Sequence, residues 1–183
     1  MLLSFKFSPF APSHLPVRGR RVARPEWSQI RSYHPTDFYA CLAVWVRASR
    51  RAHHFLGLKA WLKQGLQLWR GQLERATTWV YVEQGQVRGF ISVLTHHHIA
   101  GLFVAPGYQG SGLGSQLLQH ASEVSWLDSV AVYSLNLRAR QFYERHGFRV
   151  LEVSPVDADG QPYALWLMGR SAPGPAHGEP HRS

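Results

Sequence analysis

The chain has 183 residues, 45% of them hydrophobic, which suits one folded domain with a substantial apolar core. Its 20 basic and 11 acidic residues give a net charge of +9, which favours anionic ligands or acidic surfaces. The single cysteine, Cys41, excludes an internal disulfide and indicates a reducing, cytoplasmic compartment, and no apolar run approaches the roughly 20 residues of a membrane-spanning helix.

Both ends of the chain are rich in proline, and residues 1–25 also carry arginines without any acidic residue. Neither end has the periodicity of a helix or a strand. We therefore expect residues 1–25 and 171–183 to be disordered tails around one domain at residues 26–170. No aromatic platform for base stacking accompanies the arginines of the first tail, so nucleic-acid binding is not expected.

The first predicted elements are a strand at Trp27–Tyr33 and a helix that starts at Pro35-Thr36-Asp37 and continues from Phe38 to Ser49. A second predicted helix has one apolar stripe, which we expect to face the core. The stripe consists of Leu58, Trp61, Leu62, Gly65, Leu66, Trp69 and Leu73.

Three predicted strands follow, and the first two form a hairpin that turns at Gln84-Gly85. These strands cover Thr77–Glu83, Val87–Leu94 and Ile99–Val104. Alternating helices and strands complete the domain: a helix through Val124, a strand at Asp128–Val132, a helix at Leu137–His146 that Gly147 ends, and strands at Arg149–Val156 and Tyr163–Met168 around an Asp157–Gly160 turn.

A glycine-rich turn joins the third strand of this series to the helix that ends at Val124. Glycines have no Cβ, so their backbone amides can approach an anion closely, and the start of the helix adds unpaired N–H groups. This geometry predicts a phosphate-binding site. The glycine spacing matches neither a P-loop nor a dinucleotide-binding motif. The turn reads Gln109-Gly110-Ser111-Gly112-Leu113-Gly114.

This turn, together with the preceding Val104-Ala105-Pro106, resembles the acetyl-coenzyme A signature of the GCN5-related N-acetyltransferase (GNAT) superfamily. A second stretch, Asn136 to Phe148, is similar to that family's motif Asn-x-x-Ala-x-x-Phe-Tyr-x-x-x-Gly-Phe. The two motifs occur in the family's order. Within the superfamily the chain resembles small bacterial stand-alone enzymes, some of which modify protein lysines.

The resemblance implies an α/β fold with a mixed, mostly antiparallel central sheet of six to seven strands and about four helices. In that fold the fourth and fifth strands splay apart, and the pantetheine arm of acetyl-CoA lies between them. The glycine-turn residues Gln109, Gly110, Ser111, Gly112, Leu113 and Gly114 would bind the pyrophosphate. Backbone groups of Leu102, Phe103 and Val104 would hold the arm, and an amide near Phe103 could stabilise the oxyanion.

The resemblance also implies direct acetyl transfer to an amine, without an acyl-enzyme. Asn136 could hold the pantetheine arm while Tyr143, seven residues on and on the same helix face, protonates the departing thiolate. Each residue has an alternative role, because Asn136 could simply cap its helix and Tyr143 could be a core aromatic. Cys41 lies on an apolar helix face, which favours a core position.

The general base is less defined by the sequence. His98 stands six residues before Val104, where histone-type members of the superfamily have a catalytic glutamate, and its ordinary pKa suits the role. Glu83 and a water relayed by backbone groups are the alternatives. A metal site built from His96-His97-His98 is not expected, because adjacent strand residues point to opposite faces.

We therefore expect an acetyl-CoA-dependent N-acetyltransferase that uses no metal and acts on a primary amine, possibly a protein lysine, as a monomer or homodimer. The alternatives are a catalyst for a small metabolite or antibiotic amine, and a non-catalytic acyl-CoA-binding module. In the family the acceptor is gripped by the first two helices and the last hairpin, so Trp61 or Trp69 could line its pocket. Arg47, Arg50, Arg51, His53 and His54 could favour an anionic acceptor or form a solvated surface.

Overall fold

A computed structural model describes residues 28–67, 75–94 and 97–170 of the chain. The predictions for both tails, and those that concern Trp27, Trp69, Leu73 and His96, lie outside the described residues. No helix within the described ranges is both long and apolar enough to span a membrane.

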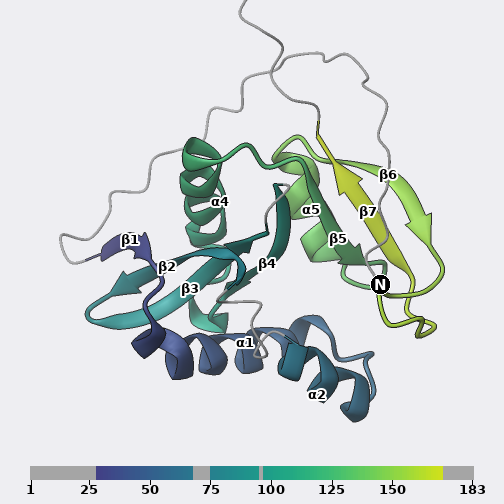
Figure 1. Ribbon diagram of the computed structural model, residues 1–183, viewed down its shortest axis with the longest axis horizontal. Helices are drawn as coiled ribbons and strands as arrows, with labels where there is room; N and C mark the ends of the chain where they lie inside the picture. The colour runs from purple at the N-terminus through teal and green to yellow at the C-terminus, as the bar shows by residue number, and fades with distance from the viewer. Residues whose placement is uncertain (1–27, 68–74, 95–96, 171–183) are drawn as a thin grey trace, which may run out of the picture.

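In the described part of the chain, seven strands form one sheet in the order β1-β2-β3-β4-β5-β7-β6 (Figure 1). All neighbouring strands pair antiparallel except β4 and β5, which are parallel. This confirms the predicted mixed, mostly antiparallel sheet. The strands are β1 (Ser28–Ser32), β2 (Thr77–Glu83), β3 (Gln86–Val93), β4 (His98–Val104), β5 (Ser129–Tyr133), β6 (Arg149–Ser154) and β7 (Leu165–Gly169).

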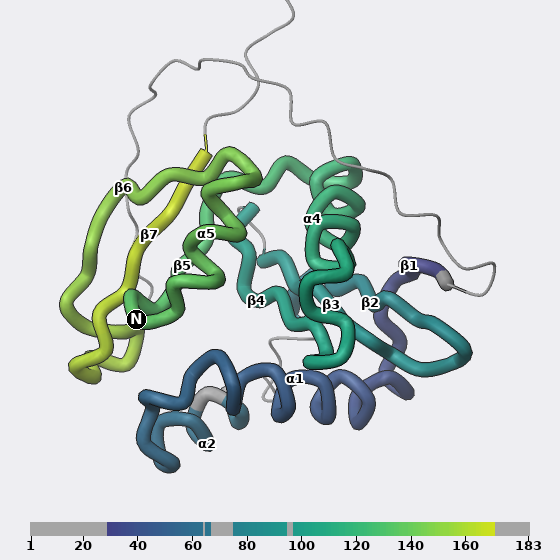
Figure 2. The backbone as a smooth tube through the Cα atoms, turned by 180° about the vertical axis from the view of Figure 1, so that it is seen from behind, coloured from purple at the N-terminus to yellow at the C-terminus, as the bar shows by residue number. Residues whose placement is uncertain are grey.

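The described ranges contain four α-helices, on opposite sides of the sheet. Helices α1 and α2 cover one face, and α4 and α5 cover the other, as both views of the backbone show (Figures 1 and 2). Short 3-10 helices precede α1 and α4. The helices are α1 (Phe38–Ala52), α2 (Leu58–Gln67), α4 (Leu113–Val124) and α5 (Leu137–Arg145), and the 3-10 turns are η1 (Pro35–Asp37) and η3 (Pro106–Tyr108).

Local sequence accounts for most of these boundaries. Gln84 and Gly85 both have positive φ, 51° and 71°, as the two-residue turn of a hairpin requires. Gly147, with φ of 84°, follows the end of α5 in the left-handed conformation that favours glycine. The predicted order of helices and strands is therefore confirmed.

Each face of the sheet carries its own buried cluster. The larger cluster lies under α4 and α5 and includes Ile91, Ile99, Leu117, Val130 and Tyr143. The smaller one lies under α1 and includes Cys41, Trp45, Val80 and Phe90. Successive side chains of a strand point to opposite faces of the sheet, so neighbouring strand residues belong to different clusters.

The apolar stripe of α2 does not face the core as one unit. The indole of Trp61 stacks on Trp45 of α1 with ring centroids 4.8 Å apart, and a Cβ on Gly65 would lie 2.9 Å from the same Trp45 ring. Leu58, Leu62 and Leu66 are instead 49–70% exposed. The prediction of a single core-facing stripe was wrong for these leucines, because α2 packs beside α1 through Trp61 and Gly65.

Strands β4 and β5 pair over only two residue pairs, His98 with Ser129 and Ile99 with Val130. On its other side, β4 pairs with β3 so that Ser92 is opposite Gly101 and Val93 is opposite Ile99. Ala100 therefore has no partner in β3 and forms a β-bulge. Such a bulge bends its strand. Beyond it β4 and β5 form a wedge that has no ladder across it, which confirms the predicted splay.

Candidate active site

Two glycines of the glycine-rich turn have backbone conformations that favour glycine. Gly110 and Gly112 have φ of 84° and 87°, which other residues rarely adopt, and a Cβ on either would meet no atom within 4 Å. Gly112 is the N-cap of α4. The turn therefore leaves its backbone accessible at the start of the helix.

The first hydrogen bond of α4 runs from the amide of Gln116 to the carbonyl of Gly112, at 3.1 Å. The amides of Leu113, Gly114 and Ser115 precede this bond and have no partner within the helix. The Ser111 hydroxyl donates to the Tyr108 carbonyl at 2.7 Å, which holds the turn together. Several N–H groups and the positive end of the helix dipole thus converge at one exposed place, an arrangement that fits a pyrophosphate.

Gly114 joins the two sequence motifs. A Cβ on Gly114 would lie 3.3 Å from Cε2 of Phe142, the residue before Tyr143 on α5. Because glycine leaves this space free, the start of α4 can approach α5. The sequence predicted both motifs but did not predict this contact, although Phe142 belongs to the second motif.

The open edge of β4 faces the wedge. The amide of Ala105 donates to the Arg88 carbonyl of β3 at 2.8 Å, so the backbone groups of Ala105 are directed to β3. The backbone N–H and C=O groups of successive strand residues point to opposite edges of the strand. Those of Phe103 therefore also point to β3, whereas those of Leu102 and Val104 point to the wedge. Consistently, the Val104 carbonyl accepts from Gln109 Nε2 at 3.1 Å.

Leu102 and Val104 are therefore placed to pair with an extended ligand in the wedge. The backbone role of Phe103 stays a prediction, and its direction toward β3 does not favour it. The Phe103 ring packs on Phe90 with centroids 5.3 Å apart. A Cβ on Gly101 would lie 2.5 Å from Phe103 Cε2, so glycine at 101 makes room for that ring.

Asn136 caps α5, as one of its two predicted roles requires. Its side-chain Oδ1 accepts a hydrogen bond from the Ala139 amide at 3.1 Å. Its predicted contact with pantetheine stays a prediction.

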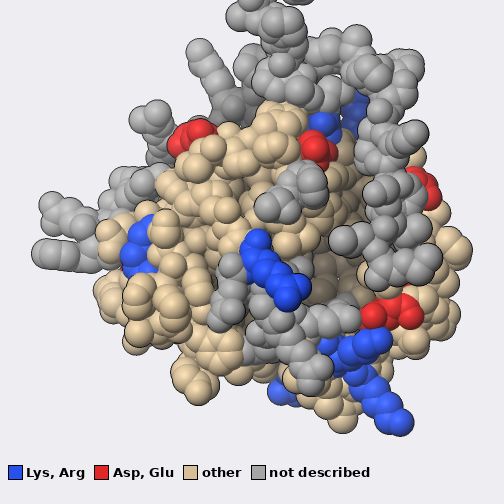
Figure 3. Space-filling model, viewed as in Figure 1, with Lys and Arg blue, Asp and Glu red and all other residues tan. Residues whose placement is uncertain are grey.

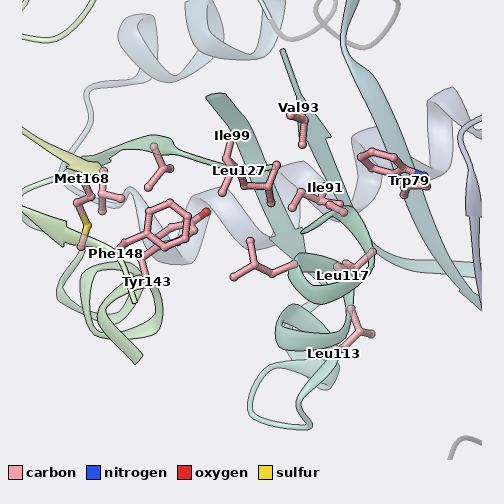
Figure 4. Close-up of a cluster of buried hydrophobic side chains, with 14 of the residues drawn as sticks. Trp79, Ile91, Val93, Ile99, Leu113, Leu117, Leu127, Tyr143, Phe148 and Met168 are labelled. Atoms are coloured by element: carbon pink, nitrogen blue, oxygen red, sulfur yellow. The ribbon is translucent and has the colours of Figure 1, made fainter. Parts of the chain in front are cut away.

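Tyr143 is buried, with 5% of its surface exposed, and its ring contacts Phe142 and Phe148 with centroids 5.1 and 5.5 Å away. Figure 4 shows it beside Phe148, with its hydroxyl directed toward the middle of the cluster. Burial raises the pKa of the Tyr143 hydroxyl above its ordinary value. The phenol therefore keeps its proton at neutral pH, as a general acid must.

His98 lies where β4 and β5 still pair, next to the apex of the wedge. Its Nδ1 is 3.0 Å from Ser129 Oγ. Burial, partly offset by the negative charge of Asp128, lowers the pKa of His98, so the imidazole is neutral at physiological pH. Glu83, the alternative base, lies at the β2–β3 turn, where its Oε2 accepts from the Tyr108 hydroxyl at 2.5 Å.

His98 and Tyr143 lie on opposite faces of the sheet. Ile99 packs in the cluster with Tyr143, so its neighbour His98 points to the face that α1 and α2 cover. Val130 packs in the same cluster, so Ser129 points the same way as His98. The two predicted proton-transfer residues, His98 and Tyr143, thus lie on different faces of the sheet.

An aromatic cluster on the α1/α2 face was not predicted as a unit. The Tyr133 ring lies 5.2 Å from His53, 5.5 Å from Phe55 and 6.3 Å from Tyr163, measured between centroids. Burial lowers the pKa of His53 to about 4, and its Nδ1 is buried without a hydrogen-bond partner among the described residues. We call His53, Phe55, Tyr133 and Tyr163 the aromatic cluster.

The aromatic cluster connects the α1–α2 loop to the segment between β6 and β7. The Gly57 amide donates to the Tyr163 hydroxyl at 3.2 Å, and Lys63 of α2 forms an ion pair with Asp159 at 3.0 Å. Figure 3 shows acidic and basic side chains side by side over this region, where α2 and the β6–β7 turn lie in Figure 1. His53 thus belongs to a packed cluster and not to a solvated surface.

Cys41 is fully buried, and burial raises the pKa of its thiol to about 12. A thiol in this state is not a nucleophile at neutral pH, which confirms its core position. Within the ranges that the structure describes, no three His, Cys, Asp or Glu residues are grouped to hold a metal ion.

Comparisons with known proteins agree with this geometry. A family profile described as "Acetyltransferase (GNAT) domain" matches residues 47–164. The chain is 31% identical to the uncharacterized N-acetyltransferase YafP of Escherichia coli, over 76% of this chain and 93% of YafP. It is 34% identical to the peptidyl-lysine N-acetyltransferase YjaB of Salmonella typhimurium, over 68% of this chain and 85% of YjaB.

The solution structure of apo-form YjaB from Escherichia coli superposes with a TM-score of 0.69. The superposition covers 79% of this chain and 99% of that structure, at 31% identity. The likeness therefore extends over most of this chain.

Proposed function

Because the chain belongs to the GNAT acetyltransferase family and is an N-acetyltransferase, we propose that it transfers the acetyl group of acetyl-CoA to lysine side chains of proteins. The observation that carries this proposal is the wedge between β4 and β5, with His98 on one face and Tyr143 on the other. A cytoplasmic location and a monomeric or homodimeric state stay predictions.

The residues at the wedge fit acetyl-CoA. The amides of Leu113, Gly114 and Ser115, which have no partner within α4, suit the pyrophosphate. The open edge of β4 at Leu102 and Val104 suits the amide groups of the pantetheine arm. When bound there, acetyl-CoA supplies an acetyl group activated as a thioester. The glycine turn and the β4 edge would orient this group toward the apex of the wedge.

The two proton-carrying residues would act on opposite sides of the wedge. His98, neutral because burial lowers its pKa, would accept a proton from the acceptor ammonium on the α1/α2 face. Tyr143, protonated because burial raises its pKa, would donate a proton to the departing sulfur on the α4/α5 face. A direct transfer needs no nucleophilic side chain, in keeping with the buried thiol of Cys41.

The aromatic cluster and the Asp157–Gly160 turn support a lysine acceptor. Aromatic rings attract an ammonium group and pack on the methylene stem of lysine. Asp159 forms an ion pair with Lys63, and its carboxylate would also attract the ammonium of an acceptor lysine. YjaB of Salmonella typhimurium, which is named as a peptidyl-lysine N-acetyltransferase, supports the same class of acceptor.

A second candidate acceptor is a small anionic amine. Arg47, Arg50 and Arg51 are exposed on α1, and no ion pair of theirs occurs within the described residues. Such an acceptor would use these guanidinium groups as counter-charges in place of Asp159. This candidate and the lysine acceptor predict different results in an acceptor screen.

An acetyl-transfer assay with the full chain tests the proposed function. We expect acetyl-CoA-dependent modification of lysine peptides, and little modification of polyamines, free amino acids or aminoglycosides. Tyr143→Phe should lower kcat about 100-fold, the contribution of one general acid, with little change in the Kd of acetyl-CoA. Tyr108→Phe, which removes a hydroxyl bonded to Glu83 at the β2–β3 turn, is the matched control.

Two results would contradict parts of the proposal. If neither acetyl-CoA nor CoA binds the folded protein at near-millimolar concentration, the assignment of the wedge is wrong. Binding without turnover on any acceptor would mean that the chain is an acyl-CoA-binding module.

A further inference from the structure

The apex of the wedge contains three polar side chains in hydrogen-bonded series. Ser129 Oγ donates to Asp128 Oδ1 at 2.7 Å, and His98 Nδ1 lies 3.0 Å from the same Ser129 Oγ. The series therefore runs from Asp128, the residue before β5, through Ser129, to His98 at the start of β4. Parallel pairing of His98 with Ser129 brings together residues that are 31 positions apart.

Proton counting fixes the direction of the series. A serine hydroxyl has one proton, and a carboxylate can only accept, so Ser129 gives its proton to Asp128. Ser129 Oγ must then accept from His98, and the proton of the neutral imidazole lies on Nδ1. The lone pair of that imidazole is consequently on Nε2.

From this series we propose that Asp128 and Ser129 are positioning residues, which hold His98 as the Nδ1–H tautomer so that Nε2 accepts the proton of the amine acceptor. This inference rests on the proposed function, in which His98 is the general base. It extends that function to two residues that neither sequence motif includes.

The surroundings of the series favour a fixed geometry. The Asp128 amide donates to the His97 carbonyl at 3.2 Å, and the Arg170 amide donates to the Asp128 carbonyl at 2.9 Å. The Arg170 guanidinium donates to the Leu127 carbonyl at 2.6 Å and to Ser122 Oγ at 2.9 Å. Among the described residues, Asp128 is the charged group that acts on His98, Arg170 interacts in turn with Asp128, and His97 is bonded to Ser125.

The first test reads the tautomer directly and needs no turnover. Nitrogen-15 NMR of the wild-type protein at neutral pH should show His98 with a proton on Nδ1 and none on Nε2. Ser129→Ala removes the hydroxyl that accepts from Nδ1–H and should shift His98 toward the Nε2–H tautomer. Ser129→Thr keeps the hydroxyl on a β-branched residue that suits a strand, and should restore the wild-type spectrum.

The second test reads catalysis. Ser129→Ala should lower kcat about tenfold, a part of the 10²–10⁴-fold effect of a general base, with the Kd of acetyl-CoA unchanged. Ser129→Thr should recover most of this loss. Asp128→Asn removes the negative charge that raises the pKa of His98, so the acidic limb of the kcat/KM profile should move to lower pH.

The inference would be overturned by an Nε2–H tautomer in the wild-type protein, or by one that Ser129→Ala does not change. A changed tautomer with unchanged kcat would also overturn it, because the series would then hold a histidine that takes no part in transfer. Failure of the wild-type protein to acetylate any acceptor would overturn the proposed function, while the NMR result would still decide the tautomer.

Discussion

Gly114 at the start of α4 lies against the ring of Phe142 on α5, and a Cβ at Gly114 would be only 3.3 Å from that ring. This contact spans the α4/α5 side of the wedge, because α4 packs on β2, β3 and β4 while α5 follows β5. It therefore fixes the distance between the phosphate-binding turn and the helix that carries Tyr143.

Gly114→Val should weaken acetyl-CoA binding and lower the free energy of unfolding by about 1–3 kcal/mol, the usual cost of overpacking. Phe142→Leu should cost stability by itself but should relieve the clash. In the double variant, the loss should therefore be smaller than the sum of the two single losses. Calorimetric titration with CoA and urea unfolding measure the two effects, and strictly additive losses would mean that the residues do not interact.

Gly112→Ala tests the backbone of the phosphate-binding turn. Its φ of 87° disfavours alanine by about 1–2 kcal/mol, and relaxation of this strain would displace the amides at the start of α4. We expect a Kd for CoA at least about tenfold higher. Gly85→Ala is the control, because Gly85 also has positive φ and open space but lies in the β2–β3 hairpin. It should lose similar stability and keep its affinity for CoA.

Asp159→Asn tests recognition of the acceptor. Loss of the negative charge should raise KM for a lysine peptide several-fold, whereas kcat and the Kd of acetyl-CoA should stay the same. Glu123→Gln makes the same charge change at an exposed position of α4 and should have no effect. A lower KM in Asp159→Asn would contradict the cationic acceptor and favour the anionic one. Asp157 is unsuitable for this test, since its Oδ1 accepts from the amides of Asp159 and Gln161 and so shapes the turn.

Asp37 should make stability depend on acid pH. Two hydrogen bonds from Arg31, at 2.6 and 2.8 Å, lower the pKa of the buried Asp37 carboxyl. A lowered folded-state pKa contributes stability above the unfolded value, near pH 4, and this stability is lost as pH falls through the folded value.

Asp37→Asn should therefore cost about 1–3 kcal/mol at pH 7, and the difference from wild type should shrink below about pH 4. Urea unfolding at pH 7 and pH 3 measures it. Glu144→Gln breaks the exposed ion pair with Arg140 on α5 and should cost at most about 0.5 kcal/mol. A cost for Asp37→Asn that does not change with pH would mean that the charge is not responsible.

The sequence predicts this fold well where the signals are local. The bounds of β2, the end of α4 at Val124 and the glycine after α5 follow from strand, helix and cap preferences within a few residues. The two motifs, with their glycine and asparagine spacing, predict the cofactor side of the site. Such signals lie within about a dozen consecutive positions.

The remaining features depend on contacts between distant parts of the chain. The bulge at Ala100 exists only in the register of β4 with β3, and no residue type marks it. The contact between His98 and Ser129 requires parallel pairing of β4 with β5. The aromatic cluster brings together residues as far apart in the sequence as His53 and Tyr163. The exposure of Leu58, Leu62 and Leu66 depends on how α2 packs on α1. Side-chain periodicity alone does not determine these arrangements.

The two-pair junction of β4 and β5 also predicts that a ligand in the wedge stabilises the protein. Most of the β4 edge lacks the neighbouring strand that would complete its hydrogen bonds, and a bound ligand in the wedge would supply that missing ladder. Binding to the folded state alone stabilises it in proportion to the logarithm of the ligand concentration. The lifetime of this protein against proteolysis should therefore follow the supply of acetyl-CoA in the cell, so that its abundance would rise and fall with the metabolite that it consumes.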